Sequence, residues 1–143
     1  MVCLKIKHMK KLEYIPGDLV MVDGFNTVYK IDNVESKPHV DDFLYELVPI
    51  GIGPIIFDLL ADSICPILIT PKILSTNGFK KVREDESGAL YFKKGLGVDI
   101  VYSYIRNCYD IYISGNKILK GIESVHELQN FLFGLKLNYE MNV

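Results

Sequence analysis

The hydrophobic positions in the first half of the chain recur in short runs separated by turn residues. The runs occupy residues 19–22, 27–34, 43–50 and 55–57, with Gly, Pro and Asp between them. The period-two alternation of residues 27–34 is typical of a half-buried strand. Several short strands at regular spacing indicate a small barrel, and a further run at 64–69 is expected to complete it. The first half therefore predicts a small SH3-like β-barrel.

The second half combines two helical patterns with several strands. Thr70 is a good N-cap and Pro71 suits the first helical position, so a short helix is predicted over residues 70–77. A second helix is predicted over residues 124–135. The strands predicted between them are residues 79–83, 89–93, 98–105, 109–114 and 117–120. This half predicts an antiparallel sheet covered by two short helices, and the whole chain is expected to be an α+β protein.

The helix at residues 124–135 has the clearest helical pattern in the chain. Ser124 and Glu127 have the spacing of a capping box, in which each side chain accepts a hydrogen bond from the backbone amide of the other residue. The apolar face consists of Val125, Leu128, Phe131, Leu132 and Leu135. Because a helix of about ten residues is marginal by itself, this face is expected to pack against the sheet. The other face carries His126, Gln129, Asn130 and Phe133.

Two domains are predicted, with the boundary at Thr70. Residues 1–69 form an acidic barrel domain with an N-terminal tail or short edge strand, and residues 70–143 form the α+β domain. Between residues 12 and 62 there are ten acidic side chains and two lysines. The formal net charge of −2 creates no overall basic field that would attract nucleic acid or a membrane surface.

The cysteines and the longest apolar run indicate a cytoplasmic protein. Cys3, Cys65 and Cys108 are far apart and form no C-x-x-C motif, which fits reduced thiols better than a disulfide framework or a zinc site. The apolar run at residues 50–69 contains Asp58 and several Gly and Pro residues. An acidic side chain at a bilayer centre costs about 2.5–3.5 kcal/mol, so this run predicts buried strands and turns instead of a membrane span.

Three stretches of the sequence resemble a known family. Residues 67–79, ILITPKILSTNGF, are similar to a segment P-I-x-L-T-x-x-x-L-x-x-x-G-F, and residues 125–135, VHELQNFLFGL, are similar to a closing segment V-H-x-L-Q-N-L-x-F-A-L. The opening GDLV at residues 17–20, with the later Asp-Gly pair, matches G-N-x-V…D-G less specifically. On these motifs the chain resembles a family of small uncharacterised proteins found in bacterial genomes, phages and mobile elements.

The chain departs from this family at two places. Gly134 stands where the family usually has Ala, and the run at residues 49–60 is longer and more apolar than usual. The resemblance implies a phage or mobile-element accessory protein, and it implies no activity, so it supplies no catalytic residue.

A candidate interaction surface lies on the helix face formed by His126, Gln129, Asn130 and Phe133. Its polar side chains either contact a partner or tie the helix to neighbouring loops through hydrogen bonds. An exposed aromatic side chain beside polar groups suits an interface. With the acidic barrel and the many tyrosines, this surface favours a non-enzymatic module that binds another protein or itself. An acidic domain of this kind would also suit the nucleic-acid-binding groove of a host protein, because its negative charge mimics that of nucleic acid.

Nucleic-acid binding is the alternative function. Basic residues interleaved with aromatic residues on a sheet can contact phosphates and stack bases. The candidate residues, all within residues 79–120, are Lys80, Lys81, Arg83, Lys93, Lys94, Arg106, Tyr102 and Tyr104. An ordinary sheet with lysines on its edges produces the same pattern, and acidic residues in this region dilute the positive field.

The sequence contains no motif for catalysis, a metal or a cofactor. G-x-S-x-G, H-E-x-x-H and a glycine-rich phosphate loop are absent. His39 with Asp41 and Asp42 offers three donor side chains, but their spacing is not that of a zinc site. No catalytic residue, metal or cofactor is therefore predicted, and an enzymatic function is not favoured.

Overall fold

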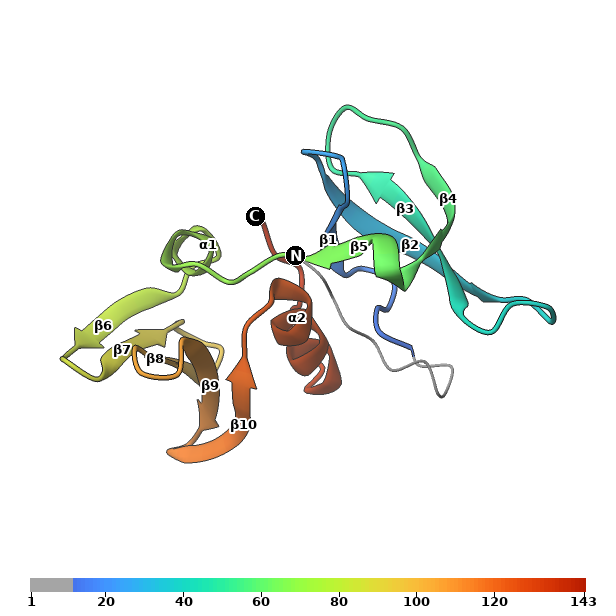
Figure 1. Ribbon diagram of the computed structural model, residues 1–143. Coiled ribbons are helices and arrows are strands. Elements are labelled where there is room, and N and C mark those ends of the chain that lie inside the picture. The colour runs from blue at the N-terminus through green and yellow to red at the C-terminus, as the bar shows by residue number, and fades with distance from the viewer. Residues whose placement is uncertain (1–11) are drawn as a thin grey trace. The chain divides into compact units, whose positions relative to one another are not determined.

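The computed structural model describes residues 12–143 of the chain (Figure 1). These residues divide into two compact units between Ile67 and Leu68, whereas the sequence places the change at Thr70. Each unit contains one five-stranded sheet, and both α-helices belong to the second unit. The α+β class predicted from the sequence is therefore confirmed. The predicted N-terminal tail, including Cys3 and most of the lysine-rich start, lies outside the described residues.

The first unit is an antiparallel sheet in the order β4-β3-β2-β1-β5. Its elements are β1 (Leu19–Val22), β2 (Val28–Ser36), β3 (Phe43–Pro49), β4 (Ile56–Leu60), the 3₁₀ helix η1 (Ala61–Ser63) and β5 (Ile64–Pro66). The predicted strands are present, but in residues 12–67 no closed barrel is detected. β4 and β5 stand at the two ends of the order, and β5 has only three residues, the last of which is a proline without an amide to donate.

The core of the first unit comes from the inward positions of its strands. Side chains alternate between the two faces of a strand, as at the start of β2, where Tyr29 and Ile31 are buried and Lys30 between them is exposed. The buried cluster consists of Tyr14, Val20, Val22, Tyr29, Ile31, Tyr45, Leu47 and Ile64. The long apolar run at 49–60 contributes little to this core, because Ile50, Ile52 and Phe57 are all exposed.

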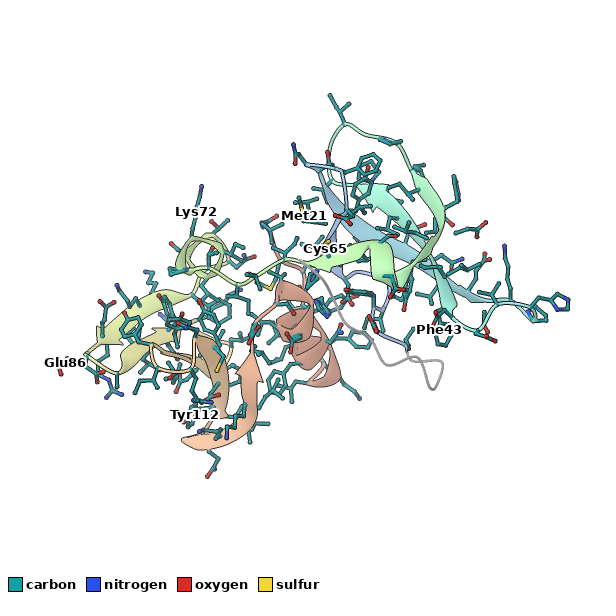
Figure 2. The ribbon with its side chains drawn as sticks, viewed as in Figure 1. Met21, Phe43, Cys65, Lys72, Glu86 and Tyr112 are labelled. Carbon is teal, nitrogen blue, oxygen red and sulfur yellow. The ribbon has the colours of Figure 1, made fainter. Side chains whose placement is uncertain are left out.

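The second unit is an antiparallel meander in the order β10-β9-β8-β7-β6. Its strands are β6 (Lys80–Glu84), β7 (Gly88–Phe92), β8 (Val98–Ser103), β9 (Cys108–Ile113) and β10 (Asn116–Ile122). All five strands were predicted, and β10 is three residues longer than its hydrophobic pattern indicated. Figure 2 shows Glu86 at the tip of the β6–β7 hairpin, where the sequence predicts a turn.

Both predicted helices form, and their N-termini are capped as expected. α1 spans Pro71–Thr76, and the Thr70 hydroxyl oxygen accepts a hydrogen bond from the Ile73 amide at 3.2 Å. α2 spans Val125–Gly134 and begins with the predicted capping box. The Glu127 carboxylate accepts a hydrogen bond from the Ser124 amide at 3.1 Å. Neither helix in the described residues is long and apolar enough to cross a membrane.

The apolar face of α2 is largely buried as predicted, although Phe131 is only partly buried, and two further residues have other environments than the pattern assigned. Val125 and Leu128 are fully buried and Leu132 is 2% exposed. Leu135, which the pattern placed on this face, is 39% exposed because the helix ends one residue before it. Gln129, which the pattern placed on the opposite face, is only 1% exposed. Figure 1 shows α2 beside the curved sheet of its own unit, next to β10.

Residues 137–143 form no strand. They are instead tied to the two helices of the second unit. The Asn77 side chain exchanges two hydrogen bonds of 2.7 Å with the backbone of Asn142, one to its carbonyl and one from its amide. The Gln129 side chain donates to the Tyr139 carbonyl at 3.3 Å. This contact explains why a polar side chain of α2 is buried.

Candidate ligand-binding pocket

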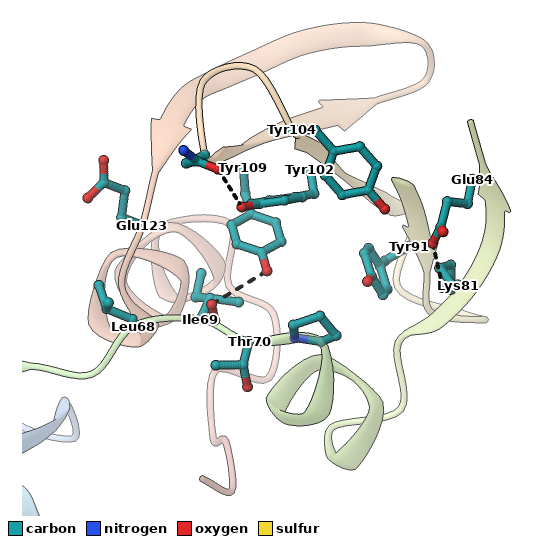
Figure 3. Close-up of a pocket in the computed structure, with 12 residues that line it drawn as sticks. Leu68, Ile69, Thr70, Lys81, Glu84, Tyr91, Tyr102, Tyr104, Tyr109 and Glu123 are labelled. Carbon is teal, nitrogen blue, oxygen red and sulfur yellow. Dashed lines mark hydrogen bonds and ion pairs between the residues drawn. The ribbon is translucent and has the colours of Figure 1, made fainter. Parts of the chain in front are cut away.

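The second unit contains an open cavity of about 510 Å³, lined mainly by tyrosine rings (Figure 3). Tyr91, Tyr102 and Tyr109 come from β7, β8 and β9, and Tyr104 follows β8. The segment at residues 68–71, leading into α1, forms the opposite wall. A volume of this size lies within the range of small-molecule and side-chain binding pockets. We call this cavity the tyrosine pocket.

Strand register brings these rings together. Tyr102 pairs with Ala89 on one neighbouring strand and with Tyr109 on the other, so the two tyrosines are direct cross-strand neighbours. Their ring centroids are 4.7 Å apart. Tyr104 is two residues beyond Tyr102 and its ring meets that of Tyr102 nearly at a right angle, with the centroids 5.5 Å apart. The rings therefore form adjoining walls of one cavity.

A β-bulge in β6 places an ion pair at the pocket. Lys81 pairs with Tyr91, but the register then shifts, so that Arg83 pairs with Leu90. Neighbouring residues on a strand point to opposite faces, so the shift sends Lys81 toward the pocket and Arg83 to the other face. It also returns Glu84 to the pocket side, where its carboxylate lies 2.5 Å from the Lys81 ammonium.

Three of the four phenol groups of the pocket have raised pKa values, and two of the four donate hydrogen bonds. Burial raises the pKa of Tyr91, Tyr104 and Tyr109 above the ordinary tyrosine value. The Tyr102 hydroxyl donates to the Asn107 side-chain oxygen at 3.2 Å, and the Tyr109 hydroxyl donates to the Ile69 carbonyl at 3.5 Å. Tyr91, Tyr104 and Tyr109 therefore remain uncharged at neutral pH, and hydrogen bonds hold the rings of Tyr102 and Tyr109 in place.

The charges on the pocket lining are one ammonium and two carboxylates, from Lys81, Glu84 and Glu123. The hydrogen bond and charge of Glu84 raise the pKa of Lys81, and the same contact lowers the pKa of Glu84. Both groups are thus ionised at neutral pH. Figure 3 shows Glu123 at the opposite end of the cavity from this pair.

The lining has the composition of a binding site. Among the described residues that line it there is no histidine, cysteine, serine or aspartate. Within residues 12–143, no three His, Cys, Asp or Glu side chains come together as a metal site would require. What the pocket offers is aromatic surface, hydrogen-bond donors and acceptors, and one exposed ion pair.

The residues predicted to bind nucleic acid do not form one surface. Lys81 and Tyr104 line the tyrosine pocket, whereas Arg83 and Arg106 line a smaller depression on the other face of the sheet. Tyr102 borders both cavities. Lys80 and Lys94 are exposed on β6 and on the turn after β7. The Lys93 ammonium lies 5.6 Å from the centre of the Phe79 ring.

The residues predicted on the polar face of α2 also have different environments. His126 Nδ1 lies 3.0 Å from the Ser124 hydroxyl, and Gln129 is buried, so Gln129 is not part of an exposed surface. The side-chain oxygen of Asn130 is buried without a hydrogen-bond partner among the described residues. Phe133 is 51% exposed and its ring packs edge-on against Tyr139, at 5.1 Å.

The depression on the other face is organised around a buried carboxylate. Asp110 is 3% exposed and accepts hydrogen bonds from Arg106 and from the Gly121 amide, the latter at 2.9 Å. The Lys117 ammonium lies 3.4 Å from the same carboxylate. Burial raises the pKa of Asp110, but the hydrogen bonds from Arg106, Gly121 and Lys117 outweigh it and lower the pKa below its ordinary value.

Asp110→Asn is expected to destabilise the protein by about 2 kcal/mol at neutral pH, because it removes the charge that holds both cations. A carboxyl group whose pKa is lower in the folded than in the unfolded state stabilises the protein at pH values above its unfolded-state pKa. This stabilisation is lost as the pH falls through the folded-state pKa. The difference in free energy of unfolding between wild type and variant should therefore shrink below about pH 4. Denaturant unfolding across pH checks this, with the exposed Glu140→Gln as control. A pH-independent difference would contradict it.

Comparison with protein-family models, with curated proteins and with solved structures finds no match to this chain. The structure of the chain defines an α+β protein with two antiparallel sheets and a tyrosine-lined pocket in the second unit.

Proposed function

We propose that this protein is a non-enzymatic interaction module that binds a segment of a partner protein, with one side chain of that segment in the tyrosine pocket. The observation that carries the proposal is the set of four tyrosine rings around an open cavity of about 510 Å³. Tyrosine contributes a large contact area at a low cost in side-chain entropy, which is why it is favoured at recognition surfaces. The pocket also borders β6, which is the last strand in the order of its sheet, and pairing with such an edge strand is one mode of peptide recognition.

The charges of the described residues favour a protein partner over nucleic acid. Nucleic-acid affinity depends on neutralising several phosphates with available cations. Lys81 is already paired with Glu84, and Arg106 and Lys117 are paired with Asp110. The bulge in β6 also divides the basic residues between two faces. Nucleic-acid binding by the sheet at residues 79–120 is therefore the second candidate.

Phe133 is a further element of the proposed interaction surface, because it is a large apolar side chain that is half exposed.

We also propose that the first unit has an SH3-like fold. A five-stranded meander whose last strand returns to pair with the first, with a 3₁₀ helix before that strand, supports it. The resemblance to small proteins of phages and mobile elements suggests an accessory role in the cytoplasm.

The proposal is tested by selecting binders from a displayed library of random short peptides, with the full chain as bait. Selected peptides are expected to lose roughly tenfold in affinity for Tyr104→Ala, as at an interface hot spot. Tyr104 is 43% exposed on a turn, so the variant should fold. Tyr112→Ala, on the other face of the sheet, is the matched control and should bind normally.

Two results would overturn the proposal. One is a selection that enriches no peptide, and the other is equal binding by wild type and Tyr104→Ala. Titration of labelled single- and double-stranded DNA and RNA at several salt concentrations tests the second candidate. Binding that weakens steeply with salt would favour nucleic acid, since it reports displaced counterions.

A further inference from the structure

We infer that the tyrosine pocket selects an organic cation, namely the ammonium or guanidinium group of a lysine, methylated lysine or arginine side chain on the partner, with Glu84 as its counter-ion. The inference rests on the proposed function and specifies the chemistry of its ligand. Four features of the pocket support it: the arrangement of the rings, their neutral state, the charges on the lining, and the position of Lys81.

The arrangement of the rings suits a cation. The face of an aromatic ring is electron-rich, and a cation within about 6 Å of its centre is attracted to it. Tyr102 and Tyr104 meet at an interplanar angle of 79°, and Tyr102 and Tyr109 at 47°. A group in the cavity therefore meets rings from more than one direction, as ammonium groups do in aromatic cages. Burial raises the pKa of Tyr91, Tyr104 and Tyr109, so these three rings are neutral at neutral pH.

The charges on the lining disfavour an anion. Glu84 and Glu123 together outnumber Lys81, so the lining has a formal charge of −1. Its other polar groups include the Asn107 side-chain oxygen and the Ile69 carbonyl, both of which accept hydrogen bonds. The excess of carboxylate would repel a phosphate or carboxylate ligand, whereas it attracts an ammonium or guanidinium group.

Lys81 shows how such a ligand would be held. Its ammonium lies 2.5 Å from the Glu84 carboxylate. Tyr91 is the cross-strand partner of Lys81, and Tyr104 lines the same cavity. Both side chains of the pair are nearly half exposed. An exposed ion pair contributes only about 0–1 kcal/mol, so a ligand cation can replace Lys81 at Glu84 at little cost. Lys81 is therefore an internal competitor for the site.

The test uses two probes of the same shape, choline and its uncharged analogue 3,3-dimethyl-1-butanol, titrated into the full chain by NMR. Choline is expected to shift the ring signals of Tyr91, Tyr102 and Tyr104 and to bind roughly tenfold more tightly than the neutral analogue. Nα-acetylated methylamides of lysine, trimethyllysine and arginine then rank the cations. The Nε-acetyllysine analogue, which is uncharged, should bind as weakly as the neutral alcohol.

Variants of the ion pair give opposite expected changes. Glu84→Gln should weaken choline binding roughly threefold, because it removes the counter-ion. Lys81→Met should strengthen it by a similar factor, because it removes the competitor. If the two residues only supported the fold, both variants would weaken binding. Glu86→Gln removes the same charge from the same hairpin, outside the pocket, and should bind as wild type.

The outcomes separate this inference from the proposed function. Equal affinity for choline and the neutral alcohol, or weaker binding by Lys81→Met, would overturn cation selectivity. Peptide binding that depends on Tyr104 would survive either result, and the proposed function with it. If Tyr104→Ala changes neither choline binding nor peptide binding, both are overturned.

Discussion

Replacing Gly88 by valine is expected to destabilise the second unit by about 3 kcal/mol, an overpacking cost at the upper end of the usual range. Gly88 begins β7, and a Cβ atom at this position would lie 1.9 Å from the backbone carbonyl oxygen of Tyr102. No side-chain rotation relieves a clash with backbone, so β7 and β8 would have to separate locally. Tyr102 would move with β8, and choline binding should be lost as well.

Amide hydrogen exchange in β8 and β9 measures this effect, because it reports the second unit separately from the first. Gly134→Ala is the control. Gly134 is the last residue of α2, and an added Cβ would meet nothing within 4 Å. Alanine is favoured over glycine within a helix by up to about 1 kcal/mol, so this variant should be equally or more stable. Unchanged exchange in the valine variant would contradict the close approach of the two strands.

Leu128→Ala is the second change with a large expected effect. Leu128 is fully buried on α2, and truncating an enclosed leucine usually costs about 2–5 kcal/mol through lost burial and the cavity left behind. Chemical denaturation followed by circular dichroism should show a loss of about 3 kcal/mol. Leu135→Ala removes the same atoms from a residue that is 39% exposed, and should cost less than about 1 kcal/mol. Similar losses in both variants would mean that α2 does not anchor the core.

Local sequence signals predicted most of the elements because each signal acts within a few residues. Thr70 and Pro71 start α1, and the capping box of Ser124 and Glu127 starts α2. Gln129 was assigned to the wrong environment. The helical pattern shows only that Gln129 is polar. Gln129 can be buried because its side chain donates a hydrogen bond to the carbonyl of Tyr139, ten residues later.

The tyrosine pocket was only partly predictable from the sequence. The sequence predicts Tyr102 and Tyr104 as nucleic-acid contacts because they are aromatic residues among basic ones. Their position as walls of one cavity depends on cross-strand register, which the sequence pattern does not show. Alternation alone would put Lys81 and Arg83 on the same face of β6. The bulge between them separates them, and no local signal in the lysine- and arginine-rich strand marks it. Asn107 and Glu123 also line the pocket, but they come from other segments of the chain and no sequence motif marks them.

The short helix α1 connects the pocket to the far end of the chain. Thr70 and Pro71 at its start belong to the pocket lining, and Asn77 at its end is hydrogen-bonded to the backbone of Asn142. A helix of six residues has little stability of its own, so its position depends on both attachments. Loss of the hydrogen bonds between Asn77 and Asn142 is therefore expected to loosen one wall of the binding site, although these residues do not touch the ligand.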